Sequence, residues 1–131
     1  ALLQAAAELK APHHLGLTAT ASGFYGFQGR NVPGFPPRDP ELWKHLAQVG
    51  VLNLEMESST LFTLASLRGV RAGTVCAVYA QRPRNEFIAE GDIPAAEARA
   101  INVGLRALEV LHAIDQAKGQ APYWYPALGL K

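Results

Sequence analysis

The chain has 131 residues, 49% of them hydrophobic and 18% charged, and a formal net charge of +1. This length suits one domain with its own core, and the composition excludes an intrinsically disordered chain. The low net charge and the lack of a basic stripe argue against a nucleic-acid partner, and no apolar stretch is long enough to span a bilayer. The single cysteine, Cys76, lies in an apolar run, so we expect a buried, reduced thiol in a cytoplasmic protein.

Helices and strands alternate along the sequence. Good helix formers fill residues 2–10, strand character marks residues 14–20, and glycines and prolines then indicate a long loop over 21–38. A loop of this length in a compact domain is usually functional. We further expect a helix capped by Asp39 with Pro40 at its first position, a strand over 51–56, a helix over 57–68 that stops at Gly69, a strand over 72–80, a loop over 81–94, a helix over 95–116 and a coil tail over 119–131.

Apolar spacing in three of these helices predicts one apolar face on each. The strand over 72–80 is almost continuously apolar, which is typical of a strand covered on both faces. The expected apolar helix positions are Leu42, Leu46 and Val49, then Leu61, Leu64, Ala65 and Leu67, and finally Ile101, Leu105, Leu108 and Leu111.

The alternation predicts a layered α/β fold with a largely parallel sheet. In such sheets ligands gather beyond the carboxyl ends of the strands, so we expect residues 21–38, 55–58 and 79–86 to meet at one rim. The chain starts at Ala1 with a helical pattern already under way, which predicts either a single domain or the C-terminal part of a longer one.

The first of these segments, SGFYGFQGR, contains a flat amide and a flat guanidinium. The Gln28 amide offers a donor beside an acceptor, which complements the imide edge of a pyrimidine. Arg30 adds a rigid fork of donors for carbonyl oxygens, and the Phe24 ring can pack against a base or a sugar. Composition alone favours a plainer interpretation, a surface loop with a satisfied polar pair.

The second segment, NLEMESS, places Glu55 and Glu57 at the end of a strand. If the strand ran through both residues, their carboxylates would share a face, and a carboxylate can accept both hydroxyls of a ribose diol. Glu57 would also lie in the first turn of the next helix, where the helix dipole stabilises negative charge. The plainer interpretation is a helix-capping acidic pair around a core methionine, Met56.

In the third segment, YAQRPRNE, Gln81 and Arg82 leave the third strand at the same rim. Arg82 would reinforce Arg30 or bind a carbonyl through water, and its plainer interpretation is a solvated loop arginine. The sequence contains no metal-ligand cluster, no P-loop ending and no nucleophile elbow.

Three stretches in this order, GLTATASGFYGFQGR, GVLNLEMESSTLFTLA and RAGTVCAVYAQR, resemble the C-terminal half of the uridine phosphorylases in the nucleoside phosphorylase superfamily. The resemblance covers about residues 13–116. The E-M-E-S box is specific for the superfamily, and the F-Y-x-x-Q-x-R spacing is specific for its pyrimidine branch. The resemblance implies a three-layer αβα fold with a mixed, mostly parallel sheet, of which this chain holds the C-terminal part.

The resemblance also implies an activity, the cleavage of uridine with phosphate to uracil and ribose 1-phosphate by a pentosyltransferase of pyrimidine salvage. It implies no cofactor and no metal, phosphate as co-substrate, and a homo-oligomer, which is a hexamer in the family. The implied roles are Phe24 lining the nucleoside pocket, Gln28, Arg30 and Arg82 as the catalytic uracil-binding residues, and Met56 and Glu57 holding the ribose with Glu55 beside them.

The sequence departs from the family at several positions. Gln81 stands where purine-specific relatives carry an aspartate, which argues against purine phosphorolysis, while Ser22, Gly29 and Tyr79 replace residues more usual in the family. The family's phosphate-binding arginines come from the N-terminal half and a neighbouring subunit, so we expect little activity from this chain alone. The alternatives are a purine nucleoside phosphorylase, a nucleosidase that uses water, and a non-catalytic nucleoside-binding module.

Overall fold

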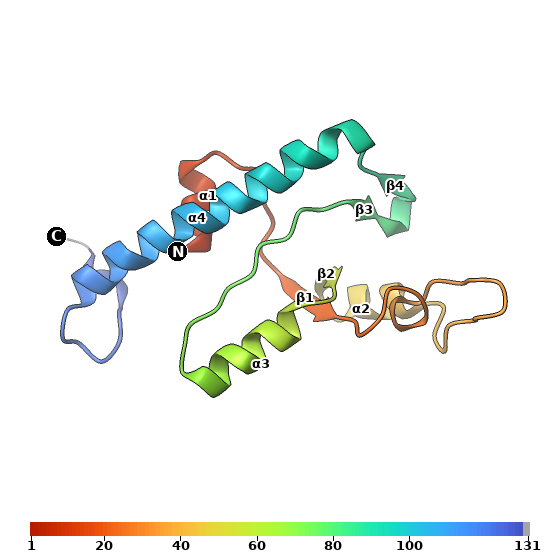
Figure 1. The fold of residues 1–131 in the computed structure, drawn as a ribbon, viewed down its shortest axis with the longest axis horizontal. Coiled ribbons are helices and arrows are strands. Elements are labelled where there is room, and N and C mark those ends of the chain that lie inside the picture. Colours follow the sequence, from red (N-terminus) through yellow and green to blue (C-terminus); the bar gives the residue numbers. More distant parts are fainter. Residues whose placement is uncertain (130–131) are drawn as a thin grey trace. The chain divides into compact units, whose positions relative to one another are not determined.

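The computed structural model describes residues 1–129, which are drawn in Figure 1 and form two compact units. The first unit comprises Ala1–His13, Val75–Gln81 and the chain from Glu86 onward, and the second comprises His14–Thr74 and Arg82–Asn85. No helix among the described residues has the length and apolar character needed to cross a membrane.

In the first unit, helix α1 (Leu2–Glu8) packs against the long helix α4 (Ile93–Lys118), as Figure 1 shows. Their shared core consists of small side chains, because Ala5 and Ala6 meet Val103 and Ala107. At the edge of this contact, Arg106 Nε donates to the Glu8 carboxylate at 2.7 Å. The unit also contains a short antiparallel pair, β3 (Ala80–Gln81) with β4 (Glu86–Phe87), and the 3-10 turns η3 (Glu90–Asp92) and η4 (Pro126–Leu128).

In the second unit, strands β1 (Leu17–Thr20) and β2 (Val51–Glu55) pair in parallel (Figure 1). Thr20 lies opposite Glu55, and the N–H of Ala21 donates to the Glu55 carbonyl at 2.8 Å. The carboxyl ends of the two strands therefore lie side by side, as the alternating pattern predicts. The unit's helices are α2 (Leu42–Gln48) and α3 (Ser58–Arg68), and its 3-10 turns are η1 (Gly26–Gln28) and η2 (Arg82–Arg84).

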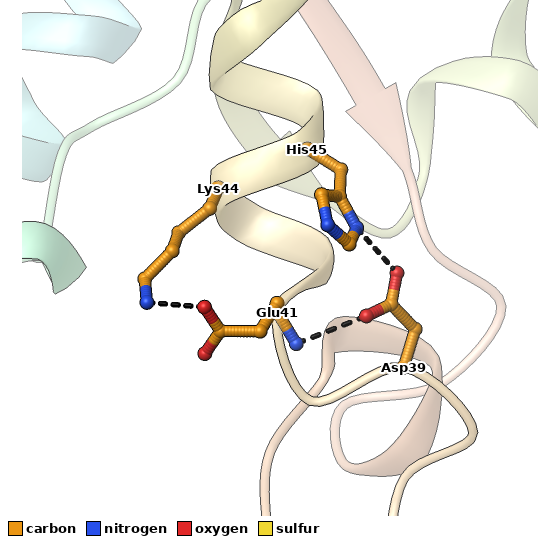
Figure 2. Close-up of polar contacts among 4 residues, drawn as sticks. All are labelled: Asp39, Glu41, Lys44 and His45. Atoms are coloured by element: carbon orange, nitrogen blue, oxygen red, sulfur yellow. Dashed lines mark hydrogen bonds and ion pairs between the residues drawn. The ribbon is translucent and has the colours of Figure 1, made fainter.

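Helix α2 begins later than predicted. Figure 2 shows that Asp39 acts before the helix, because its carboxylate accepts from the N–H of Glu41 at 3.0 Å and pairs with His45 Nδ1 at 2.8 Å. Lys44 pairs with Glu41 in the same turn. The hydrogen bond with His45 lowers the pKa of Asp39. Asp39 thus organises the turn that leads into α2, while Glu41 occupies the residue before its first helical position.

The strand expected over 72–80 is wrong except at its last residue. Residues 70–79 form no regular element and pair with no strand in the described part of the chain (Figure 1). The run is apolar enough for a strand, but a strand also needs a neighbouring backbone to share its hydrogen bonds. Cys76, within this run, is exposed rather than buried.

Most of the predicted apolar helix faces are also exposed. Val49 is 70% exposed and Leu67 is 75% exposed, while Ala65 is the buried apolar residue of α3. On α4 the buried residues are Val103, Ala107 and Val110, and the expected positions Ile101, Leu105 and Leu108 face solvent. Periodicity located apolar faces, but it does not say whether the chain itself supplies the surface that covers them.

In the predicted coil tail, residues 119–129 contain turns, bends and η4, while Leu130 and Lys131 lie outside the described residues. The order of helices and strands confirms an α/β chain. Within residues 1–129 the strands form two separate two-stranded sheets, one parallel and one antiparallel.

The contact of α1 with α4 predicts a position-specific effect on stability. Ala5 is fully buried, so Ala5→Leu should lower the free energy of unfolding by about 1–3 kcal/mol through overpacking. Ala7 lies exposed on the same helix, and Ala7→Leu should change it by less than about 0.5 kcal/mol. Urea unfolding followed by circular dichroism measures both. Equal effects would contradict the placement of Ala5.

Candidate active site

The loop after β1 winds into η1, which fixes Gln28 and Arg30 relative to each other. Their two N–H groups both donate to the Tyr25 carbonyl, at 3.0 Å each. Between them, Gly29 adopts a left-handed conformation with φ of +67°, and a Cβ at this position would lie 2.8 Å from the Asp39 carbonyl oxygen. Gln28 is only 5% exposed, so the loop holds a polar amide in a buried position.

The Arg30 guanidinium stacks on the Phe24 ring, with Cζ 4.1 Å from the ring centroid. Stacking of this kind fixes the plane of the guanidinium and leaves its edges able to donate. The Nε atom of Arg30 is buried and has no hydrogen-bond partner within residues 1–129. An unsatisfied buried N–H is costly, so an acceptor placed against it would be bound favourably.

Arg82 joins this loop from a distant part of the sequence. Its Nη1 donates to the Gln28 backbone carbonyl at 2.5 Å. Burial lowers the pKa of Arg82, and the positive charge of Arg30 lowers it further. The plainer interpretation of Arg82 as a solvated loop residue is therefore wrong, because it contacts the loop and lies close enough to Arg30 for the two charges to repel each other.

The Glu55 carboxylate caps helix α3. Its Oε2 accepts from the N–H groups of Glu57 at 2.8 Å and Ser58 at 2.6 Å, and its Oε1 accepts from the Thr20 hydroxyl. Burial alone would raise the pKa of Glu55, but the hydrogen bonds from Thr20 and from the two N–H groups lower it to about 2. Glu55 is therefore ionised at neutral pH and already engaged within the protein.

Glu57 differs from Glu55 in its surroundings. Its side chain is exposed, and its Oε2 accepts from the N–H of Met56 at 3.1 Å. Strand β2 ends at Glu55, so the two carboxylates do not share a strand face. Met56 is 37% exposed, so its plainer interpretation as a core methionine is wrong. Of the two carboxylates, Glu55 therefore caps the helix, and Glu57 presents its carboxylate to solvent.

The predicted site residues fall into two groups within the second unit. The arginine group consists of Phe24, Gln28, Arg30 and Arg82, and the acidic group consists of Glu55, Met56 and Glu57. Among the described residues no hydrogen bond or ion pair joins the two groups. Strand β1 connects them, because Thr20 bonds to Glu55 and the strand then leads into the loop that carries the arginine group.

Sequence reasoning missed the contribution of Thr20. Its hydroxyl donates to Glu55 and accepts from the N–H of Ser59 at 3.0 Å. The signal was present, because Thr20 is the last residue of a strand expected to run parallel to the strand that ends at Glu55. No cluster of three or more His, Cys, Asp or Glu able to hold a metal ion occurs within residues 1–129.

Comparison with known proteins identifies the family. A family model described as "Phosphorylase superfamily" matches residues 1–113, so the chain belongs to this superfamily. A uridine phosphorylase from Thermococcus kodakarensis is 41% identical over 98% of this chain and 46% of its own length. One from Klebsiella aerogenes is 34% identical over 82% of this chain and 44% of its own length. These relatives confirm the resemblance to uridine phosphorylases.

A DeoD-type purine nucleoside phosphorylase from Caldanaerobacter subterraneus is 39% identical, over 47% of this chain and 24% of its own length. No solved structure gave a significant match. The chain spans less than half the length of the curated relatives it matches.

The close approach at Gly29 predicts a difference between two glycines. Gly29→Ala should destabilise the protein more than Gly34→Ala, since both have positive φ but only Gly29 has a neighbouring backbone atom within 4 Å. The left-handed conformation costs each alanine about 1–2 kcal/mol, and Gly29→Ala adds the clash with Asp39. Urea unfolding gives the free energy of unfolding of both variants. If Gly29→Ala and Gly34→Ala lowered it equally, the close approach of Gly29 to the Asp39 carbonyl would be ruled out.

The capped carboxylate predicts the direction of a pH effect. The pKa of Glu55 is lowered from 4.5 to about 2, so its stabilising effect is complete above about pH 4.5 and is lost as the pH falls toward 2. Glu55→Gln should therefore lower the free energy of unfolding by about 1–3 kcal/mol at pH 7 and by much less near pH 2. Glu57→Gln is the matched control. Its free energy of unfolding should still fall as the pH approaches 2, because Glu55 is intact. If the free energies of unfolding of wild type and Glu55→Gln differed by the same amount from pH 7 to pH 2, the capping role would be contradicted.

Proposed function

We propose that the protein is a uridine phosphorylase, which cleaves uridine with phosphate to give uracil and ribose 1-phosphate. The observation that carries the proposal is that Arg30 and Arg82 both attach to the loop that buries Gln28, because Arg30 lies two residues after Gln28 and Arg82 Nη1 donates to the Gln28 carbonyl, in a chain of this superfamily. Two guanidinium groups on one loop, and the unsatisfied Nε of Arg30, suit an electron-rich planar group. The relatives with the greatest coverage of the chain carry the name uridine phosphorylase.

In the proposed reaction, the donors Gln28, Arg30 and Arg82 lie where negative charge develops on the leaving base. The bond between ribose C1′ and uracil N1 breaks, and its electron pair goes to the base. A phosphate oxygen forms the new bond to C1′, and the phosphate proton passes to the base. Gln28 and Arg30 stabilise the negative charge that spreads to the uracil carbonyls, with Arg82 reinforcing them. Phe24 packs against the nucleoside and keeps Arg30 in plane.

In this proposal the acidic group binds the sugar. The exposed Glu57 carboxylate accepts the ribose hydroxyls, and Met56 packs beside the pentose. Glu55 is engaged with backbone N–H groups, so its part is to hold the turn that carries Glu57. A negative charge near the pentose also suits a sugar that becomes positive as the glycosidic bond loosens.

We further propose that the chain is the C-terminal part of a longer phosphorylase domain with a three-layer αβα architecture and a mixed, mostly parallel sheet. Support comes from the length of the relatives, the apolar run over 70–79, which forms no strand in the described part of the chain, and the exposed apolar faces of α3 and α4. The proposal includes residues outside this chain for the phosphate site, phosphate as co-substrate with no other cofactor, a homo-oligomer and a cytoplasmic location.

A purine nucleoside phosphorylase is the second candidate, because a relative of that name matches part of the chain. Product analysis separates the candidates when uridine, inosine and methylthioadenosine are each supplied with and without phosphate to protein made from the complete reading frame. Phosphate-dependent formation of uracil supports the first proposal, and release of hypoxanthine supports the second. Base release without phosphate indicates a nucleosidase, and no product from any substrate indicates a binding module.

The role of Arg30 predicts a large catalytic loss. Arg30→Ala should lower kcat/KM for uridine by about 10²–10³-fold, the loss expected when one donor to a developing anion is removed. Arg38→Ala is the control, since Arg38 is an exposed arginine in the same loop and should leave the rate within about twofold. Steady-state uracil release measures both variants. A rate for Arg30→Ala equal to that of the control would refute the assigned role.

A further inference from the structure

We propose that Thr20 is a positioning residue for the sugar-binding part of the site, acting through Glu55 and Ser59 to fix the turn that carries Glu57. The inference rests on the proposed function, in which Glu57 accepts the ribose hydroxyls. It adds a residue from a different strand, whose side chain touches neither the arginine group nor Glu57.

The geometry places the Thr20 hydroxyl at the centre of a small network. The hydroxyl donates to Glu55 Oε1 and accepts from the N–H of Ser59 at 3.0 Å. A single side chain thus bonds to the last residue of β2 and to the first turn of α3. With the two N–H groups that Glu55 accepts, three consecutive N–H groups, those of Glu57, Ser58 and Ser59, are satisfied by Thr20 and Glu55.

This network fixes Glu57 because Glu57 lies inside it. The N–H of Glu57 is bonded to Glu55, and the residues on either side of the turn are held by the strand pair and the helix. Within residues 1–129 the exposed Glu57 carboxylate accepts one hydrogen bond, from the N–H of Met56, so its direction depends on the backbone of the turn. Without the Thr20 hydroxyl, Glu55 Oε1 loses a donor and the N–H of Ser59 loses its acceptor. The backbone of the turn that carries Glu57 is then held less firmly.

Thr18 provides an internal comparison on the same strand. Its hydroxyl accepts from Asn53 Nδ2 at 2.9 Å, which is also a cross-strand bond between β1 and β2. Thr18 lies two residues before Thr20, and its side-chain hydrogen bonds within residues 1–129 are with Asn53 rather than with Glu55 or α3. Removal of the Thr18 hydroxyl therefore weakens the strand pair without altering the turn at residues 55–59.

The test compares Thr20→Val, Thr20→Ser and Thr18→Val in protein made from the complete reading frame, with uridine and with 2′,3′-dideoxyuridine, which has no diol. Thr20→Val should lower kcat/KM for uridine about tenfold and for the dideoxy substrate less than about twofold. Thr20→Ser keeps the hydroxyl, and its kcat/KM for uridine should lie within about threefold of the wild-type value. Thr18→Val should leave the ratio of kcat/KM for uridine to kcat/KM for the dideoxy substrate unchanged.

A double variant tests whether the effect passes through Glu57. Thr20→Val should cause no further loss for uridine when it is added to Glu57→Ala, because the group that it positions is then absent. Equal losses for both substrates, or a full additional loss in the Glu57→Ala background, would give Thr20 a structural role only and overturn the inference. Absence of turnover in the unsubstituted protein would instead overturn the proposed function.

Amide hydrogen exchange tests the network independently of turnover. The Ser59 N–H should exchange at least about tenfold faster in Thr20→Val than in wild type or Thr20→Ser, since it loses its acceptor. Thr20→Ala takes the place of Thr20→Val if valine prevents folding. Unchanged exchange at Ser59 in a folded variant without the hydroxyl would show that Thr20 does not hold the turn.

Discussion

The Glu55 carboxylate is the point at which two strands and a helix are joined. It accepts one hydroxyl from the end of β1 and two N–H groups from the start of α3, while its own backbone belongs to β2. Parallel strands end at the same edge, so a polar side chain at one end can reach the first turn that follows its neighbour. These bonds hold the acidic group in place, and the position of Glu57 depends on Glu55, whose carboxylate is already bonded to Thr20 and to two N–H groups of the turn.

The two groups of side chains carry opposite charges, which suits the reaction proposed for them. The arginine group concentrates positive charge at a buried amide, whereas the acidic group leaves a carboxylate exposed to solvent. A nucleoside that breaks at its glycosidic bond develops negative charge on the base and positive charge on the sugar. A protein that provides each sign of charge on a separate loop can favour both developments without the two groups neutralising each other.

The sequence was sufficient to predict the α/β order, the parallel relation of the first two strands and the helix stop at Gly69, because these follow from local patterns. It did not predict that residues 70–79 form no strand within residues 1–129, since strand pairing depends on a distant backbone rather than on the run itself. In the acidic group the two glutamates look equivalent in the sequence, and only the end of β2 at Glu55 distinguishes the cap from the exposed carboxylate. The position of Thr20 at the end of a strand was predictable, but its hydrogen bonds to Glu55 and Ser59 depend on where the neighbouring strand ends.

The contact between Gly29 and the Asp39 carbonyl also constrains how the protein can vary during evolution. A side chain at position 29 requires a different path for the backbone that approaches α2, so substitutions at position 29 should accompany insertions, deletions or altered turn residues over 36–41. A relative with a larger residue at this position should therefore differ in the length or course of residues 36–41 as well. Position 29 and residues 36–41 should then vary together among relatives whose loop buries a glutamine as Gln28 is buried here.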